Sequence, residues 1–366
     1  MNDLSFNNLK KGFYLLGKNF LFYISRKINY PLAPPDTLQL NINFNCNLRC
    51  VMCHMDKKKV LVKKELTLED LEAFVVQAKK MGIKNVLILG GEPFLWRDLF
   101  KLIVFCNEEG LDTTVITNGV LLNQNMIKKI IQSKLPHIHI SLDGATSETH
   151  DIIRGKGVFN KAVNNIQLLN AYKAKNNTQF PTIGTTFTIM KHNFHELSEV
   201  VKLAQKLGID GLNFQPVVID NTEPRLRSKS SSVWIEDDDL NKLDTVIDKL
   251  IELKKQSREN YVFIENTVSN LNLIRKYFKR MLSPKAQPCY AGFNRLHVTQ
   301  IGTSYLCDVS FGDLKKRTLK EIWFSKEAKE QRKKIKNCQT PCMQFCSYRS
   351  EFYMVKNQLG KIFVRK

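Results

Sequence analysis

The stretch "TLQLNINFNCNLRCVMC" (residues 37–53) joins a short apolar run to a loop that holds three cysteines. Residues 37–44 are rich in branched side chains, and this composition predicts a β-strand. Cys46, Cys50 and Cys53 follow at once, at spacings that let thiolates converge on one small metal cluster. Tetrahedral zinc and ordinary iron–sulfur sites use four ligands. The stretch therefore predicts either a fourth ligand from elsewhere in the chain or a metal position left open.

Short apolar runs alternate with amphipathic helical stretches from this strand to about residue 220. One helix is expected to begin after Thr67 as N-cap, with Asp70 three residues later, and to end at Gly82. Six strand–helix repeats predict an α/β protein with a parallel sheet and right-handed crossovers. Such sheets place their chemistry at the carboxyl ends of the strands. The further expected strands are "NVLILGGEP", "TTVITNG", "HIHISLDG", "IGTTFTIM" and "GLNFQPV", and the further helices are 98–109, 123–133, 160–174 and 195–207.

The chain has 366 residues, enough for one large α/β domain and a smaller one. Its nine cysteines are an odd number and cluster toward the two ends of the chain. A secreted disulfide scaffold would be shorter and would follow a signal peptide. The cysteines therefore predict metal binding in a reducing compartment, and we expect a cytoplasmic protein. Cys106 stands alone in "LFKLIVFCNEEG" and is expected to be a core residue.

The formal net charge is +21, and the last fifty residues contribute strongly to it. A basic excess can indicate nucleic acid, an anionic membrane surface or acidic substrates, whereas a Lys-rich chain with solvated faces has the same composition. RNA-binding signatures with interleaved aromatic residues are absent from the sequence, so no nucleic-acid partner is expected.

The stretch "LKKGFYLLGKNFLFYISRKINYPLAPP" (residues 9–35) is aromatic and basic. Its apolar runs are too short to span a bilayer, and it lacks a small-residue cleavage site. Phe13, Leu16, Phe20 and Ile24 repeat at helical spacing. One interpretation is a helix packed on the body of the domain. The other is an interfacial helix in which residues 10–28 contact a membrane surface, peripheral at the inner membrane face.

The motif "CNLRCVMC" resembles the cluster motif of the radical S-adenosylmethionine (radical SAM) superfamily, and the resemblance spans residues 37–220. "GGEP" resembles the second-strand motif that holds the methionine amino group of SAM, and "TNG" a frequent end of the third strand. Ser141 in "SLDG" and Arg154 in "HDIIRG" match positions that contact the ribose or carboxylate of SAM. The resemblance implies a partial (βα)6 barrel whose Cys46, Cys50 and Cys53 hold a 4Fe–4S cluster. The implied SAM-binding residues are Gly90, Gly91, Glu92, Pro93, Asn118, Ser141 and Arg154.

The resemblance also implies a reaction. SAM chelates the open iron, and one electron from the reduced cluster releases methionine and a 5′-deoxyadenosyl radical, which takes a hydrogen atom from the substrate. The cofactor performs the hard chemistry, and the protein positions it. A zinc knuckle completed by His54 is the alternative for the triplet, but it leaves "GGEP" and the strand–helix pattern unexplained. An electron carrier of the ferredoxin type would need a fourth local cysteine.

Five further cysteines stand near the C-terminus, where Gly302 is expected to turn a hairpin between two short strands. The region resembles the SPASM or shortened "twitch" extension of radical SAM enzymes, which carries auxiliary 4Fe–4S clusters. A full SPASM domain has seven cysteines and two clusters, so the five here imply one auxiliary cluster, and a structural zinc site is the alternative. Cys289, Cys307 and Cys338 are the expected ligands, with Cys342 or Cys346 as the fourth.

These motifs predict four segments: a basic aromatic helix (1–35), a radical SAM partial barrel (36–220), a linker and helix (221–285, the helix at 236–258) and a cysteine-rich auxiliary iron–sulfur domain (286–366). Asp308 directly follows Cys307. In dehydrogenases of the family that oxidise a protein side chain, an acid at the matching place acts as general base, so Asp308 is a candidate catalytic residue. It could equally cap the hairpin. His150 is given no role.

The leading expectation is a radical SAM dehydrogenase or oxidase of a sugar, a lipid-linked glycan or another metabolite, because an auxiliary cluster can accept the substrate's electron. The expected partners are such a substrate and a low-potential electron donor such as flavodoxin or ferredoxin. A peptide- or protein-modifying maturase, epimerase or crosslinking enzyme is the alternative. Two non-enzymatic hypotheses remain. One is an iron–sulfur or zinc protein that binds nucleic acid, and the other is a membrane-docked scaffold.

Overall fold

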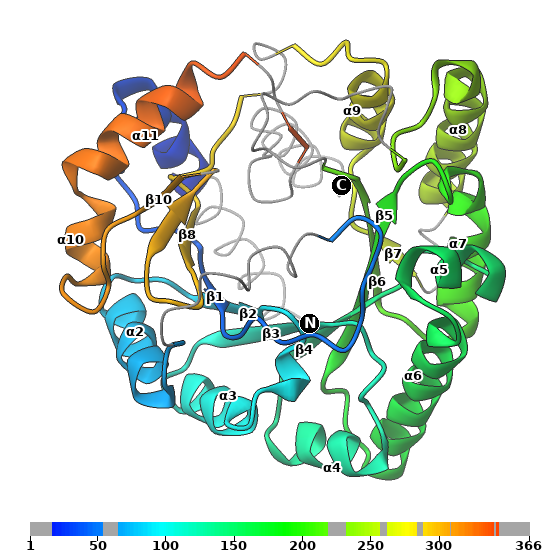
Figure 1. Ribbon diagram of the computed structural model, residues 1–366, viewed down its shortest axis with the longest axis horizontal. Coiled ribbons are helices and arrows are strands. Elements are labelled where there is room, and N and C mark those ends of the chain that lie inside the picture. Colours follow the sequence, from blue (N-terminus) through cyan, green and yellow to red (C-terminus); the bar gives the residue numbers. More distant parts are fainter. Residues whose placement is uncertain are drawn as a thin grey trace, which may run out of the picture.

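A computed structural model describes residues 17–53, 65–218, 232–256, 262–283, 288–307, 309–339 and 342–343. Within these ranges ten strands form one curved sheet in the order β10-β9-β8-β1-β2-β3-β4-β5-β6-β7 (Figure 1). The strands are β1 (Thr37–Asn41), β2 (Asn85–Leu89), β3 (Asp112–Thr117), β4 (His137–Ser141), β5 (Thr182–Ile189), β6 (Gly211–Pro216), β7 (Phe263–Ile264), β8 (Arg295–Val298), β9 (Ser304–Leu306) and β10 (Val309–Phe311).

Helices cover the outer side of this sheet, and its ends do not meet, since β7 and β10 stand at the two edges (Figure 1). The helices are α2 (Leu68–Lys80), α3 (Leu99–Glu108), α4 (Gln124–Gln132), α5 (Ser147–Arg154), α6 (Val158–Lys175), α7 (Leu197–Lys206), α8 (Leu240–Gln256), α9 (Val268–Phe278), α10 (Leu319–Trp323) and α11 (Lys326–Lys336). The six predicted strands are β1–β6, all parallel, so the α/β partial barrel is confirmed. The short helix α5 was not among the expected helices.

Strands β1, β2 and β4 alternate buried and half-buried residues, and one large apolar core joins the barrel strands to the surrounding helices. Leu38 and Leu40 of β1 are fully buried there, together with Leu71 of α2. Each such side chain stabilises the fold by roughly 1.5–3 kcal/mol. Cys106 belongs to this core, as predicted, and burial raises the pKa of its thiol to about 12.

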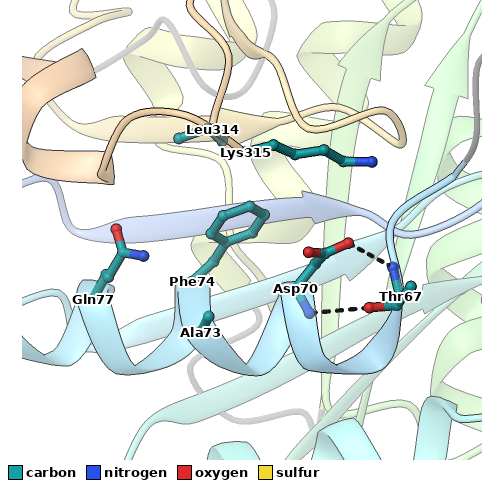
Figure 2. Close-up of a pocket in the computed structure, with 7 residues that line it drawn as sticks. All are labelled: Thr67, Asp70, Ala73, Phe74, Gln77, Leu314 and Lys315. Atoms are coloured by element: carbon teal, nitrogen blue, oxygen red, sulfur yellow. Dashed lines mark hydrogen bonds between the residues drawn. The ribbon is translucent and has the colours of Figure 1, made fainter.

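Helix α2 begins with the predicted cap. The hydroxyl of Thr67 accepts from the amide of Asp70, and the carboxylate of Asp70 accepts from the amide of Thr67 (Figure 2). A pocket of about 390 Å³ lies beside this cap, between α2 and the segment that carries Leu314 and Lys315. Thr67 and Asp70 are hydrogen-bonded to each other, so neither is left to bind a ligand in the pocket through those atoms. We therefore interpret the pocket as part of the contact between the barrel and the C-terminal region.

The C-terminal region extends the barrel sheet. Strand β8 pairs in parallel with β1, and β9 and β10 follow it as antiparallel strands. Gly302 has a φ of +79° in the turn between β8 and β9, which confirms the predicted hairpin. Residues 232–256 and 262–283, which fall in the predicted linker and helix, form α8, β7 and α9, and β7 pairs in parallel with β6. The positions of the domain boundaries stay predictions.

The N-terminal helix is described over residues 17–28 and packs against the C-terminal region. Phe22 lies in a small buried cluster with Tyr290 and Phe293. Arg26 donates to the carbonyl of Cys289 at 3.0 Å. This part of the helix therefore packs on the body of the protein, as one of the two interpretations expected. Among the described helices none has both the length and the apolar character to cross a membrane.

Candidate functional site

The loop with the cysteine triplet starts at the carboxyl end of β1 and runs along the end of β2. The amide of Ile42 donates to the carbonyl of Leu89 at 2.8 Å, and that of Gly91 to the carbonyl of Asn43 at 2.9 Å. The amide of Glu92 donates to the carbonyl of Asn45 at 2.6 Å. The pairing between β1 and β2 thus continues past both strands and stops one residue before Cys46.

Gly90 and Gly91 permit this close approach. A Cβ atom on Gly91 would stand 2.1 Å from the carbonyl oxygen of Asn45, and one on Gly90 would stand 2.8 Å from that of Asn43. Real Cβ atoms do not come so near to a backbone oxygen. The two glycines of "GGEP" therefore fix the start of the cysteine loop against β2.

Glu92 is fully buried at the end of β2. Its Oε1 accepts from the hydroxyl of Thr117 at 2.7 Å and from the amide of Phe94 at 3.2 Å, and its Oε2 accepts from the amide of Asn118 at 2.9 Å. Burial raises the pKa of this carboxyl, and its effect is larger than the opposite effect of the three hydrogen-bond donors. A carboxylate oxygen can accept two hydrogen bonds, so Oε2 can still accept from a ligand ammonium group. Pro93, also buried, begins a single helical turn behind it.

Asn118 connects the end of β3 to the cysteine loop. Its side-chain amide donates to Oδ1 of Asn47 at 2.8 Å, and its own Oδ1 accepts from the amide of Val120. Asn47 is the residue directly after Cys46. The loop is thus held on both sides of Cys46, by β2 before it and by β3 after it.

The end of β4 brings a charge to the triplet. Asp143, fully buried, accepts from Nε of Arg154 at 2.6 Å, and Nη1 of Arg154 lies 3.9 Å from Sγ of Cys50. Burial alone would lower the pKa of Arg154, but the charges of Asp143 and Cys50 outweigh it and raise that pKa. The guanidinium therefore stays charged beside Cys50. Ser141, the last residue of β4, is half-buried opposite Thr186.

Cys46, Cys50 and Cys53 occupy one loop, the first two half-buried and the third exposed. Burial is the main reason that the pKa of the Cys50 thiol is raised to about 11; Asp143, Cys53 and Cys46 also raise it, while Arg154 lowers it. In the described part of the chain no three His, Cys, Asp or Glu side chains meet closely enough to hold a single metal ion. A cluster takes one thiolate for each iron, so its ligands need not meet at one point. Three soft donors beside a buried arginine fit a 4Fe–4S cluster with one open iron.

The C-terminal cysteines lie around the β8–β9 hairpin and the end of α11. Cys289 and Cys307 both pack on the small apolar cluster that includes Ile335. Cys338 follows α11, and its amide donates to the carbonyl of Ile335 at 3.2 Å. Cys342 is half-buried. Two predicted site residues, Cys346 and Asp308, lie outside the described residues, so the ligand set stays a prediction.

Three buried residues of this region were not singled out in the sequence. Asp143 stood inside the quoted "SLDG", so the motif could have indicated it. Gln300 donates to the carbonyl of Asn43 at 3.3 Å, and Glu196 accepts from the amide of Ala145 at 2.6 Å. Neither has a local signal, because each acts on residues far away in the chain.

Comparisons with known proteins agree with this geometry. A model of the radical SAM superfamily matches residues 40–204, and one of the SPASM iron–sulfur cluster-binding domain matches residues 289–347. The chain is 25% identical over 306 residues to Fe-coproporphyrin III synthase of Methanosarcina barkeri, covering 77% of this chain and 72% of that protein. It is 28% identical over 283 residues to a probable GTP 3′,8-cyclase of Saccharolobus islandicus, covering 75% and 83%.

Solved structures share the fold. Streptococcus suis SuiB bound to S-adenosylmethionine superposes with a TM-score of 0.65 at 18% identity, covering 83% of this chain and 68% of that one. The enzyme anSMEcpe with bound AdoMet gives 0.63 at 19% identity, covering 91% and 94%. At such identities the likeness concerns the fold alone.

Proposed function

Because the chain is a member of the radical SAM superfamily with a C-terminal SPASM domain, we propose that it dehydrogenates a sugar, a lipid-linked glycan or another metabolite. Its cofactors are a 4Fe–4S cluster, SAM and an auxiliary iron–sulfur cluster. When bound, they supply one electron that cleaves SAM and a 5′-deoxyadenosyl radical that takes a hydrogen atom from the substrate. The choice of substrate and of dehydrogenation is our proposal.

One observation carries this proposal. The triplet loop is hydrogen-bonded to the carboxyl ends of β2 and β3 and lies against Arg154 of α5. Cys46, Cys50 and Cys53 would hold the cluster, and Arg154 would place its positive charge beside it. The buried Glu92 and Asn118 would line the adjoining SAM site. Such fixed polar groups need little reorganisation when charge develops.

Dehydrogenation is supported by the SPASM domain, since an auxiliary cluster can accept the electron that the substrate radical gives up. Cys289, Cys307 and Cys338 would hold that cluster, with Cys342 or Cys346 as the fourth ligand. Asp308 would then take the proton that the substrate loses. Low-potential donors such as flavodoxin or ferredoxin would return the electron to the SAM cluster. We place the reaction in the cytoplasm, with membrane contact through residues 10–28.

A second candidate is peptide or protein modification. It is favoured by the fold neighbours, since SuiB has been solved bound to its precursor peptide SuiA and anSMEcpe with peptides. The curated relatives favour a third substrate class, since two are a Fe-coproporphyrin III synthase and an AdoMet-dependent heme synthase, the latter matched over 48% of its length. A panel of glycans, lipid-linked sugars, peptides and tetrapyrroles would separate these substrate classes.

The test is anaerobic. The purified chain is reconstituted with iron and sulfide, SAM and dithionite are added, and 5′-deoxyadenosine is measured beside a Cys50→Ala control. We expect the wild type alone to form it and each true substrate to increase its yield. A chain loaded with iron that does not bind SAM would contradict the proposal. Salt-sensitive nucleic-acid binding without SAM cleavage would instead support the non-catalytic alternative.

A further inference from the structure

Over its described residues 17–28, the N-terminal helix packs on the protein through one face. Phe22 and Ser25 are fully buried on that face. Arg26 continues it and donates to the carbonyl oxygens of Cys289 and Lys336, at 3.0 and 3.3 Å. These contacts fix the rotation of the helix about its axis, and they also fix which residues face outward.

The outward face of the helix is apolar. Phe20 is 63% exposed and Ile28 is 54% exposed, while Leu21 is exposed as well and Ile24 is half-buried. Residues 20, 24 and 28 follow one another at the spacing of one helix face. The sequence pattern singled out Phe20 and Ile24 as one apolar stripe. The structure turns this stripe away from the core.

Two aromatic side chains extend the stripe beyond the end of the helix. Tyr30 is 51% exposed and Phe324 is 43% exposed, and their ring centroids lie 5.7 Å apart. Phe324 comes from the junction between α10 and α11. The apolar surface is therefore shared by the N-terminal helix and the C-terminal region, and it is held together by tertiary contacts.

Lysines flank this apolar surface. Lys27 is exposed, and its Nζ lies 5.4 Å from the ring of Tyr23. The side chain of Asn29 donates to the carbonyl of Lys329 at 3.1 Å, which ties the helix end to α11, and the two helices lie side by side in Figure 1. Six residues of α11 are basic and two are acidic. Its exposed lysines are Lys326, Lys329, Lys333 and Lys334.

The acids of α11 reduce this positive charge only in part. Glu327 and Glu330 are both exposed, but Glu327 is paired with Arg317, 3.1 Å from its Nη1. The surface as a whole thus keeps a positive excess. Apolar and aromatic side chains between lysines match a bilayer interface, where rings enter the headgroup layer and ammonium groups meet anionic lipids.

We propose that this surface docks the enzyme onto membranes that contain anionic phospholipid. We call it the docking patch, formed by Phe20, Leu21, Ile24, Ile28, Tyr30 and Phe324 and flanked by Lys27 and the exposed lysines of α11. The proposal extends the membrane contact proposed above for residues 10–28, and it rests on that contact. The new element is that α11 and Phe324 belong to the contact, so the helix lies on the bilayer with the C-terminal region beside it.

The full chain, reconstituted anaerobically, is sedimented with vesicles of phosphatidylcholine alone and of phosphatidylcholine with 30% phosphatidylglycerol. The wild type is compared with Phe20→Ser/Ile28→Ser and with Lys329→Glu/Lys333→Glu. The matched controls are Met281→Ser, which replaces an exposed apolar side chain elsewhere, and Lys128→Glu/Lys161→Glu, which makes the same charge change on α4 and α6.

We expect the wild type to bind the anionic vesicles at least tenfold more tightly than neutral ones. Both patch variants should lose at least tenfold in this binding, while both controls keep it. Equal loss in Lys128→Glu/Lys161→Glu would show that net charge alone acts and would overturn the proposal. A wild type that ignores anionic vesicles would overturn it too, as would a dimer that the Phe20→Ser/Ile28→Ser variant disrupts.

Formation of 5′-deoxyadenosine is measured in every sample. We expect all four variants to form it at the wild-type rate, because none of the changed residues lies at the candidate SAM site. The two measurements therefore test the membrane proposal and the radical SAM proposal separately. Thermal unfolding of each variant checks that the fold is intact.

Discussion

Arg154 shows most directly how one residue connects the sheet to the cysteine triplet. Its guanidinium lies between the buried carboxylate of Asp143 and the thiol of Cys50. Replacing Arg154 with Met would leave Asp143 charged and buried without its counter-ion. Losses of this kind cost about 3–5 kcal/mol. We expect Arg154→Met to lower the free energy of unfolding by that amount, measured by anaerobic urea denaturation.

A double variant separates this electrostatic cost from a simple loss of packing. Asp143→Asn/Arg154→Met removes both charges, so its free energy of unfolding should be higher than that of Arg154→Met alone. If the two variants were equally unstable, the ion pair would not be the source of the cost.

At the scale of elements, the strand ends β1 and β2 position Cys46. Gly91→Ala would place a methyl group against the carbonyl of Asn45, and overpacking of this kind costs about 1–3 kcal/mol. Because the strain falls one residue before Cys46, we expect iron binding at the triplet to fail. The iron content should fall toward that of Cys50→Ala. Gly17→Ala, whose Cβ would meet nothing within 4 Å, is the control and should keep its iron.

The turn that follows strand β8 reaches the same loop from the C-terminal region. Gln300 is buried and donates to the carbonyl of Asn43, three residues before Cys46. Gln300→Leu removes one hydrogen bond, so we expect a loss of stability of about 1 kcal/mol. We also expect a changed electron paramagnetic resonance signal of the SAM-site cluster. The exposed Gln339→Leu should change neither, and an unaltered signal in Gln300→Leu would argue against this coupling.

At the scale of the whole molecule, buried histidines make stability depend on pH. Burial lowers the pKa of His297 to about 3 and those of His139 and His150 to about 4. The unfolded chain takes up protons near pH 6.5, whereas the native chain does not, so stability present above pH 6.5 is lost as the pH falls. Between pH 7 and 5 we expect His297 alone to account for about 2 kcal/mol of this loss.

His297→Gln should therefore flatten the plot of unfolding free energy against pH by about that amount. Urea denaturation at pH 7, 6 and 5 measures it. His195→Gln, a matched change in a residue with an exposed side chain, should leave the slope as it is in the wild type. A slope that His297→Gln leaves unchanged would mean that His297 has the same pKa in the native and in the unfolded chain.

Much of the fold could be predicted because its signals are local. Thr67 and Asp70 define a helix start within four residues, and the apolar runs of β1–β6 reflect strands covered by helices. The site was predicted to the extent that its residues follow strand ends. The helix α5, which carries Arg154, was missed because it has only eight residues, about two turns.

The sequence by itself determined the partial barrel, the cysteine triplet and the hairpin at Gly302, since periodicity, capping and glycine turns act over a few residues. Only the tertiary structure decided that β8 pairs with β1, that Asp143 holds Arg154 beside Cys50, and which face of the N-terminal helix is buried. Helical periodicity defines a face but not the partner that covers it. That choice depends on contacts between residues hundreds of positions apart, such as Arg26 with Cys289. The local sequence around each of the two residues does not indicate the other.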